Sequence, residues 1–435
     1  MIARRILFTS ILWVGLFVHS QNKQLLYDFT EVPQALMLNP GMETDFQWHA
    51  GIPLLSGISL QAGSSGISVN DIFANDGLDI NDKVRDRAIN GMKIKDEFSS
   101  TIQIELLNGG FRGLDANTYY SFGIYNEIDF ISYWPKDYAI LAFEGNADKL
   151  NEQFDLSHLK TRGEMLNVFH FGINKKLNKS LILGARGKFY SSIIDFNSTR
   201  NKGYFVTTEG QNNILASTLS ADMQVRTSGI DALESASDSN NVPGTIIKRG
   251  LFGGNLGLGL DLGFTYYLNG QTVLTGSLLD LGFIYHANSV ENFALKGDET
   301  IEGVEIILPD ALLDPDQDFW EDLVDEVEAL VPFEETTNSY LSFRPTKLYA
   351  SLRYNFGEPI EGSVDCNCDY SNSDGGRVIT KYRNSLGAQL YVINRPRGPQ
   401  SAISAFYQRR FGNFMALKTT YTADKFTLSN VGLGV

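Results

Sequence analysis

The histidines are the first residues to test for chemistry, because imidazole is the commonest side chain in acid–base catalysis and zinc binding. Outside the N-terminal leader they are His49, His158, His170 and His286, and they stand far apart in the chain. Their spacing fits no zinc site, and the chain contains neither a Gly-x-Ser-x-Gly elbow nor a phosphate-cradling loop. We therefore expect a protein that is not an enzyme, with no catalytic, metal or cofactor site.

An acidic run begins with Asp314, Asp316 and Asp318, the alternating pattern that opens a calcium-binding loop. The sixth position of such a loop needs glycine, but here it is Phe319, so we favour a solvated acidic helix over 314–331. Apolar residues recur along this run at helical spacing. This stripe is a candidate surface for docking on a partner or on the rim of a barrel: Phe319, Leu323, Val327 and Leu330.

Cys366 and Cys368 are the only cysteines, and one residue separates them. A disulfide between them is sterically difficult. We interpret the pair as loop cysteines, with weak metal capture or a strained disulfide as minor alternatives.

Charged residues also occur inside runs that alternate between apolar and polar positions, the pattern of a β-strand with two different faces. Two acids lie on the polar face of 119–133, two bases on that of 181–189, and one acid on that of 255–268. Charges on the inner face of a strand need water or counter-ions, which the lumen of a barrel supplies. We predict that these five residues face a lumen: Glu127, Asp129, Arg186, Lys188 and Asp261.

The segment 255–268 is the strongest of these strands, because leucine alternates there with glycine, aspartate or threonine over an unusual length. Strands that cross a bilayer need roughly 9 to 11 tilted residues, whereas soluble strands have about 5 or 6. The segment therefore indicates a membrane-spanning strand with leucines on its lipid face.

The first 20 residues have the order of a secretory signal peptide, with Arg4 and Arg5 before the apolar run 6–18. We expect cleavage near Ser20 and a location in the cell outer membrane. The formal net charge of −15 argues against nucleic acid as a partner.

No apolar run after the leader is long enough for a membrane helix, so a membrane-embedded chain must form a closed antiparallel barrel. The alternating runs predict an all-β barrel of about 14 strands over 21–435. Residues 138–144 are among the predicted strands. We expect 63–98 to be a plug or cap of turns and helix, and 287–340 to be a long insertion that carries the acidic helix.

Several short motifs resemble one group of proteins. After the leader comes Ala35-Leu36-Met37-Leu38-Asn39-Pro40, and later Gly51-Ile52-Pro53-Leu54-Leu55-Ser56 and Arg344-Pro345-Thr346-Lys347-Leu348-Tyr349. In this order they resemble an uncharacterised family of Bacteroidota outer-membrane β-barrels, close to the PorP/SprF-like membrane proteins of type IX secretion and to fatty-acid-transporter-like barrels. The resemblance implies an outer-membrane barrel and, by analogy alone, a link to surface secretion or gliding.

Three functions follow from these patterns. We expect first a non-enzymatic barrel that docks cell-envelope machinery, plausibly type IX secretion or gliding. The alternatives are a channel or transporter for a small or hydrophobic solute, and a secreted soluble all-β adhesin. Its partners would be membrane lipid and lipopolysaccharide, together with secretion-machinery or surface proteins. Arg395, Arg397, Arg409 and Arg410 could contact lipopolysaccharide phosphates or a partner, but we favour ordinary loop and rim charges. Because 425–435 reads as a strand from the middle of a barrel, we also expect the C-terminal end to be truncated.

Overall fold

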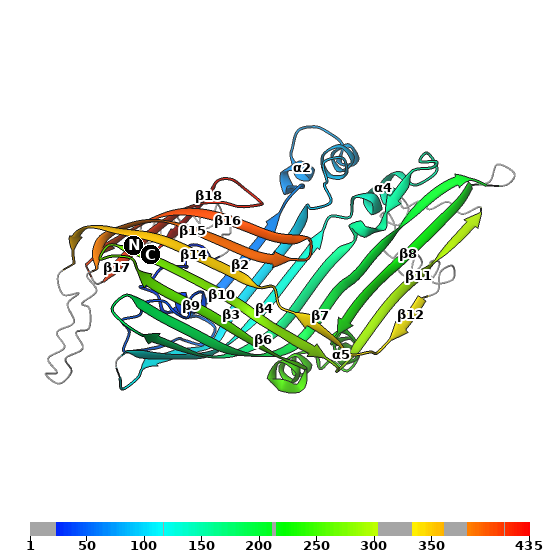
Figure 1. The fold of residues 1–435 in the computed structure, drawn as a ribbon. Coiled ribbons are helices and arrows are strands. Elements are labelled where there is room, and N and C mark those ends of the chain that lie inside the picture. Colours follow the sequence, from blue (N-terminus) through cyan, green and yellow to red (C-terminus); the bar gives the residue numbers. More distant parts are fainter. Residues whose placement is uncertain (1–22, 116, 211–214, 303–332, 361–380, 413) are drawn as a thin grey trace, which may run out of the picture.

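The computed structural model describes residues 23–435 apart from 116, 211–214, 303–332, 361–380 and 413 (Figure 1). The predicted leader, the acidic helix 314–331 with Phe319, Leu323, Val327 and Leu330, and the cysteines Cys366 and Cys368 all lie outside the described residues.

The described chain forms one large antiparallel β-sheet. Its main ladder runs through twelve strands, each paired with the next. They are β2 (Ile58–Ser64), β3 (Glu97–Arg112), β4 (Thr118–Tyr133), β6 (Lys160–Lys176), β7 (Leu181–Glu209), β9 (Asn255–Tyr267), β10 (Thr272–His286), β14 (Lys347–Pro359), β15 (Tyr382–Arg395), β16 (Gly398–Phe411), β17 (Met415–Ala423) and β18 (Asn430–Gly434). Within the described residues no strand ladder joins β2 to β18, so the sheet is not closed there.

Strand β7 is long enough to serve two parts of the sheet. Its first half pairs with β9, and its second half pairs with β8. Strand β8 pairs with β11, and β11 pairs with β12. These strands extend to the right in Figure 1. Six further strands bring the described chain to 18 strands. The predicted number of about 14 therefore depends on whether adjacent strand segments are counted separately or together. These additional strands are β1 (Trp48–Ala50), β5 (Gln153–Asp155), β8 (Leu215–Ser228), β11 (Val290–Glu302), β12 (Phe333–Thr336) and β13 (Tyr340–Phe343).

The prediction of one long insertion over 287–340 was wrong at its edges, because β11, β12 and β13 belong to the sheet. The sequence prediction missed β11 because this strand is highly charged, with Lys296, Asp298 and Glu299 exposed. A backbone ladder to β8 on one side and β12 on the other stabilises this strand without a buried apolar face.

The two ends of the main ladder differ. Short turns join β3 to β4, β6 to β7 and β9 to β10 at one end, where β14 also ends and β15 begins. At the other end lie a tight turn from β15 to β16 and the longer connections that carry the helices, apart from η2, which precedes β1. Among the described residues no helix is long and apolar enough to cross a membrane. The helical elements are η2 (Pro33–Met37), α2 (Val69–Phe73), α3 (Ile80–Lys83), η3 (Val84–Ile89), α4 (Lys136–Glu144), η4 (Leu156–His158), α5 (Ile230–Asp238), α6 (Val242–Lys248) and η6 (Arg249–Gly253).

Two segments with a sequence prediction contain these helices. The predicted strand 138–144 is wrong, because the segment forms α4. Its Tyr138, Ile140 and Leu141 pack on a cluster around Phe154 and Phe205, so tertiary packing decides the conformation of an apolar run that fits either structure. The predicted plug or cap 63–98 forms α2, α3 and η3, which lie at one end of the sheet rather than inside it (Figure 1).

The two faces of the sheet have opposite chemistry, as alternation predicts. On β9, Leu256, Leu258, Leu260 and Leu262 are exposed, whereas Asp261 between them is fully buried. The predicted assignment of the leucines to the outer face is therefore confirmed in the structure. The inner faces enclose a polar interior, and the outer faces form an apolar belt.

Candidate functional site

The interior of the sheet is occupied by residues 23–42, which we call the interior segment. Tyr27 is fully buried and its ring stacks on Tyr349 of β14, with ring centroids 4.9 Å apart. Leu38 joins the same buried cluster. The stretch before β1 therefore occupies the interior, whereas 63–98, predicted as a plug or cap, lies at one end of the sheet.

The second half of the interior segment is fastened to one wall, formed by β6, β7, β9 and β10. The side-chain amide of Asn174 donates to the Pro40 and Met42 carbonyls at 2.8 and 2.7 Å. The Thr265 hydroxyl donates to the Gly41 carbonyl at 2.8 Å, and the Ser277 hydroxyl to the Leu38 carbonyl at 2.5 Å. The Arg186 guanidinium of β7 donates to the Leu36 and Met37 carbonyls at 3.0 and 2.5 Å. Neutral donors and one arginine of the wall therefore satisfy the carbonyls of a segment that has no strand partner.

Glycines in this wall let the Asn39-Pro40-Gly41 turn approach the sheet closely. A Cβ on Gly184 of β7 would lie 2.0 Å from the Pro40 oxygen, and a Cβ on Gly263 of β9 would lie 2.1 Å from the Asn39 side-chain oxygen. Any larger residue would displace the turn. The Asn-Pro motif noted in the sequence is therefore the point where the interior segment meets the wall.

The first half of the interior segment is fastened to the opposite wall, formed by β14, β15, β16 and β17. Here charged side chains dominate. The Arg353 guanidinium pairs with Asp28 at 2.9 Å, and the Arg410 guanidinium pairs with Glu31. The Lys418 ammonium donates to the Tyr27 carbonyl at 2.5 Å. Burial disfavours the ionised form of Glu31, but the charge and hydrogen bond of Arg410 together hold its pKa below the usual value.

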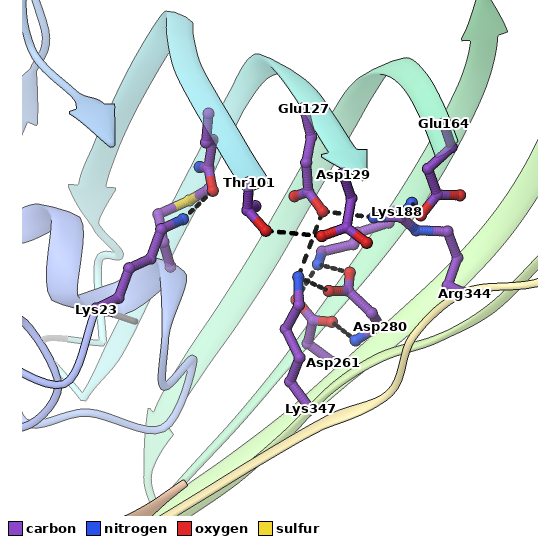
Figure 2. Close-up of polar contacts among 12 residues, drawn as sticks. Lys23, Thr101, Glu127, Asp129, Glu164, Lys188, Asp261, Asp280, Arg344 and Lys347 are labelled. Carbon is purple, nitrogen blue, oxygen red and sulfur yellow. Dashed lines mark hydrogen bonds and ion pairs between the residues drawn. The ribbon is translucent and has the colours of Figure 1, made fainter. Parts of the chain in front are cut away.

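Beside the interior segment, a chain of ion pairs crosses the interior (Figure 2). We call it the cross-wall network, and its members are Arg186, Asp261, Lys188, Asp280, Lys347, Glu127, Arg344 and Glu164. Successive pairs lie 2.5 to 3.3 Å apart where Arg186 meets Asp261, where Lys188 meets both aspartates, and where Lys347 meets Asp280 and Glu127.

Several links of this network join strands that are not neighbours in the sheet. Glu127 belongs to β4, whereas Lys347 opens β14 and Arg344 directly follows β13. The Arg344 guanidinium lies 2.6 Å from the Glu127 carboxylate, although 217 residues separate them. In the same way Arg395 of β15 pairs with Asp129 of β4 at 2.5 and 3.1 Å. The interior is therefore bridged from wall to wall.

Little space remains between the interior segment and the network. The cavity between them has a volume of about 30 Å³ and is lined by Lys23, Leu38, Glu127, Asp280 and Lys347. That is room for roughly one water molecule.

The five residues that the sequence singled out all lie on inner faces and are buried: Glu127, Asp129, Arg186, Lys188 and Asp261. The structure gathers all but Asp129 into the cross-wall network. Sequence reasoning missed Glu164, Asp280, Arg344 and Lys347. Asp280 carried a signal, since it interrupts the apolar run Leu278-Leu279-Asp280-Leu281.

Asp280 also marks an irregularity in the wall. It lies at a β-bulge between β9 and β10 and has a left-handed φ of 60°. Its backbone N–H donates to the Asp261 carboxylate at 2.7 Å, and its own carboxylate accepts from Lys188 and Lys347. The bulge aims one strand residue at two cations.

Two of the four arginines interpreted as loop and rim charges, or as lipopolysaccharide contacts, do not lie at the surface. Arg395 and Arg410 are buried and engaged by Asp129 and Glu31. Their side chains alternate inward along β15 and β16, so they stabilise the interior instead.

The histidines occupy separate environments. The Nε2 of His286 lies 2.8 Å from the Ser342 hydroxyl and 3.8 Å from the Asp195 carboxylate. Both partners face the same ring nitrogen, so this buried trio lacks the relay order of a catalytic triad. Among the described residues no group of three or more His, Cys, Asp or Glu side chains could hold a metal ion.

Comparison with known proteins adds a family. A model of the family of unknown function DUF5723 matches residues 40–435. No curated protein matches the chain.

Two solved structures are similar to this one. One is the toluene transporter TodX of Pseudomonas putida, at a TM-score of 0.32 and 8% identity over 88% of this chain and 74% of that chain. The other is the RagAB peptide importer, at a TM-score of 0.23 and 8% identity over 79% of this chain and 36% of that chain. These TM-scores are too low to carry a conclusion. The family match covers most of the sequence, and the chain therefore belongs to the family of unknown function DUF5723.

Proposed function

We propose that this protein is an outer-membrane β-barrel whose interior segment works as a plug, and that a small solute crosses when the plug is displaced. The main observation behind this proposal is that residues 23–42 occupy the interior and contact both walls. An interior plug has a use in a conduit, whereas a scaffold that only docks partners would need none.

The membrane location rests on the outer face. Strands β9, β10, β14, β15 and β16 expose apolar side chains along their outer positions. A soluble adhesin would leave this belt in water, where a contiguous apolar surface of such extent promotes association. We therefore place the protein in a bilayer, with the short turns on the periplasmic side.

The chemistry of the plug supports release of its first half. Asp28 and Glu31 are held by ion pairs, and a buried ion pair contributes little net stability because desolvation offsets its attraction. Water that follows a solute into the interior would hydrate both partners and weaken the pairs further. The Asn39-Pro40-Gly41 turn, which is held by neutral hydrogen bonds and close packing, would remain as the fixed end.

Single-channel recording in planar bilayers tests this proposal. We expect the native protein to be silent, and a variant with both Arg353→Met and Arg410→Met to conduct. Arg383→Met is the matched control, because Arg383 forms an exposed pair with Glu358 outside the interior. Heat-modifiable gel mobility would verify that each variant is folded.

A cross-link that holds the interior segment in place provides a second test of the same proposal. Lys23 donates to the side chain of Gln103 on β3, so Lys23→Cys with Gln103→Cys places two thiols in reach of a short bis-maleimide. The cross-link would be made in a Cys366→Ser, Cys368→Ser background that also carries the two methionine substitutions. Conductance should disappear on cross-linking. A folded double variant whose residues 23–31 are open to protease but which never conducts would overturn the transport proposal.

We also propose docking as a second function, on a separate observation. Phe73, Leu78 and Ile80 are exposed around α2 and α3, at the end of the sheet that carries the long connections. Exposed apolar groups of this kind are typical of contact surfaces. A partner from type IX secretion or gliding machinery rests on the sequence resemblance alone.

The docking proposal predicts that changing Phe73, Leu78 and Ile80 to serine abolishes recovery of a co-purifying envelope protein. Removal of 310–331 tests the acidic helix in the same way. Both variants should still insert in the membrane. Unchanged recovery in both would exclude these two contacts. In either function we propose a non-enzymatic protein.

A further inference from the structure

The outer face of the wall contains a hollow that neither proposed function uses. It lies over β4, β6, β7 and β9, has a volume of about 810 Å³, and we call it the wall groove. Sites for small molecules commonly have about 300 to 1,000 Å³. Its sides are formed by Phe122, Ile124, Phe169, Phe171, Phe189 and Leu258.

The groove exists because small residues interrupt the outer layer of side chains. Gly187 of β7 points outward, and a Cβ added there would meet nothing within 4 Å. Ala185, two residues before it, is the other small outward residue of the floor. On both sides the aromatic rings of β4 and β6 and the leucine of β9 stand higher than this floor.

The inner layer at the same level consists mostly of glycine, and the ring of Tyr190 lies against two of these glycines, Gly259 and Gly282. Gly123, His170, Lys188, Gly259 and Gly282 form one continuous row across β4, β6, β7, β9 and β10. Three of the five residues in this row have no side chain. His170 and Lys188 reach the groove from inside, but both are more than nine-tenths buried, and two aspartates bind Lys188. The groove therefore offers no free charge to a ligand.

A ring outside the groove supports two of the rings that line it. Phe252 of η6 has a left-handed φ of 67°, and its ring stacks on Phe169 with centroids 4.5 Å apart. It also meets Phe189 edge-on at 5.4 Å. These contacts extend the apolar surface beside the groove.

The groove lies in the part of the wall that matches a membrane crossing. Strand β7 pairs with β9 from Leu181 to Ser192, which is close to the roughly 9 to 11 residues that a tilted strand needs. The groove residues Ala185, Gly187 and Phe189 are in the middle of this stretch. They face the hydrocarbon layer if the protein is placed as proposed above.

We propose that the wall groove is a binding site for one acyl chain of a bilayer lipid. An acyl chain is apolar, narrow and flexible enough to follow a groove of this kind, and it is the molecule present at that depth. The lining excludes a charged or strongly hydrogen-bonding ligand, because burying such groups without partners is unfavourable. The inference rests on the proposed membrane location but not on transport or docking.

The test is photo-cross-linking of the full-length protein in vesicles that contain phosphatidylethanolamine with a diazirine in its acyl chain. We expect labelled peptides to concentrate in 166–176 and 181–192. The variant Gly187→Leu fills the groove from an open position and should lose this label. Ala405→Leu is the matched control, because Ala405 is a small outward-facing residue of β16 outside the groove.

The possible outcomes distinguish failure of the groove site from failure of the proposed membrane location. Release of the native protein by carbonate would overturn the membrane location and the groove together. An embedded protein that is labelled evenly around the belt, or whose label survives Gly187→Leu, would overturn the groove site alone. Native mass spectrometry provides a second measurement: one retained phospholipid should be lost in Gly187→Leu and kept in Ala405→Leu.

Discussion

The two halves of the interior segment are held by different chemistry. Residues 23–31 depend on charged side chains that reach them from β14, β16 and β17. Residues 34–42 depend on the Arg186 guanidinium at Leu36 and Met37, on neutral donors to the carbonyls of 38–42, and on glycines that admit the backbone. Water can replace the partners of an ion pair, but it cannot replace a close steric fit. We therefore infer that residues 23–31 leave the interior more readily than the Asn39-Pro40-Gly41 turn.

The largest effect should come from leaving one charge of the first half without its partner. Arg353→Ala leaves the buried Asp28 carboxylate without its cationic partner and should destabilise the segment by about 3 to 5 kcal/mol. Limited proteolysis at 23–31, followed by urea unfolding in detergent, measures this. Removing both charges with Asp28→Asn and Arg353→Met should recover most of the loss. A double variant as unstable as the single one would contradict the view that the pair itself contributes little.

A steric change in the second half should have the next largest effect. Gly184→Ala places a methyl group against Pro40 and should cost about 1 to 3 kcal/mol. Gly187→Ala is the matched control, three residues along the same strand in open space. Hydrogen exchange of residues 34–42 should rise in the first variant and stay unchanged in the second. Equal exchange in both would mean that the turn does not rely on this contact.

Removal of a neutral donor should weaken the second half less. Asn174→Ala deletes two hydrogen bonds to the Pro40 and Met42 carbonyls and should cost about 1 to 3 kcal/mol, nearer the lower limit if water enters. Exchange should increase at 38–42 but not at 23–31. If both halves loosened together, the segment would be one cooperative unit and the comparison would fail.

The smallest effect should be that of mild acid on Glu31. Its pKa is lowered in the folded state, so its contribution is present above the unfolded value of about 4.5 and is lost as the pH falls through the folded value. Protease protection of 23–31 should therefore be the same at pH 7 and pH 5. Glu31→Gln should abolish any loss seen below pH 4.5. A loss between pH 7 and 5 would point to another titrating group.

The sequence predicted the faces of strands better than their partners. Alternation placed Glu127, Arg186 and Asp261 on inner faces, because side-chain direction in a strand is a local property. The connections among them depend on contacts between distant strands, such as Glu127 with Arg344, and no local pattern encodes these. For this reason the site could be predicted as a set of inward charges but not as a network.

The interior segment was missed for a related physical reason. Residues 23–42 have neither strand alternation nor a long helical stripe, and their conformation is imposed by Asn174, Ser277, Arg353 and Lys418, all more than 130 residues later. In contrast, 63–98 carries helix and turn signals, including the Ser68 and Asp71 capping box that begins α2. Those signals predicted local structure correctly but said nothing about its position.

The contact between Lys418 and the Tyr27 carbonyl has a consequence for biogenesis, because 391 residues separate its partners. Contacts of such long range form late in folding, since the intervening chain must first be ordered. While the early strands assemble, Lys23 can contact Gln103 of β3, but the strands that hold Tyr27, Asp28 and Glu31 have not yet formed. The position of the first half of the interior segment is therefore fixed only when the last strands have been added to the sheet.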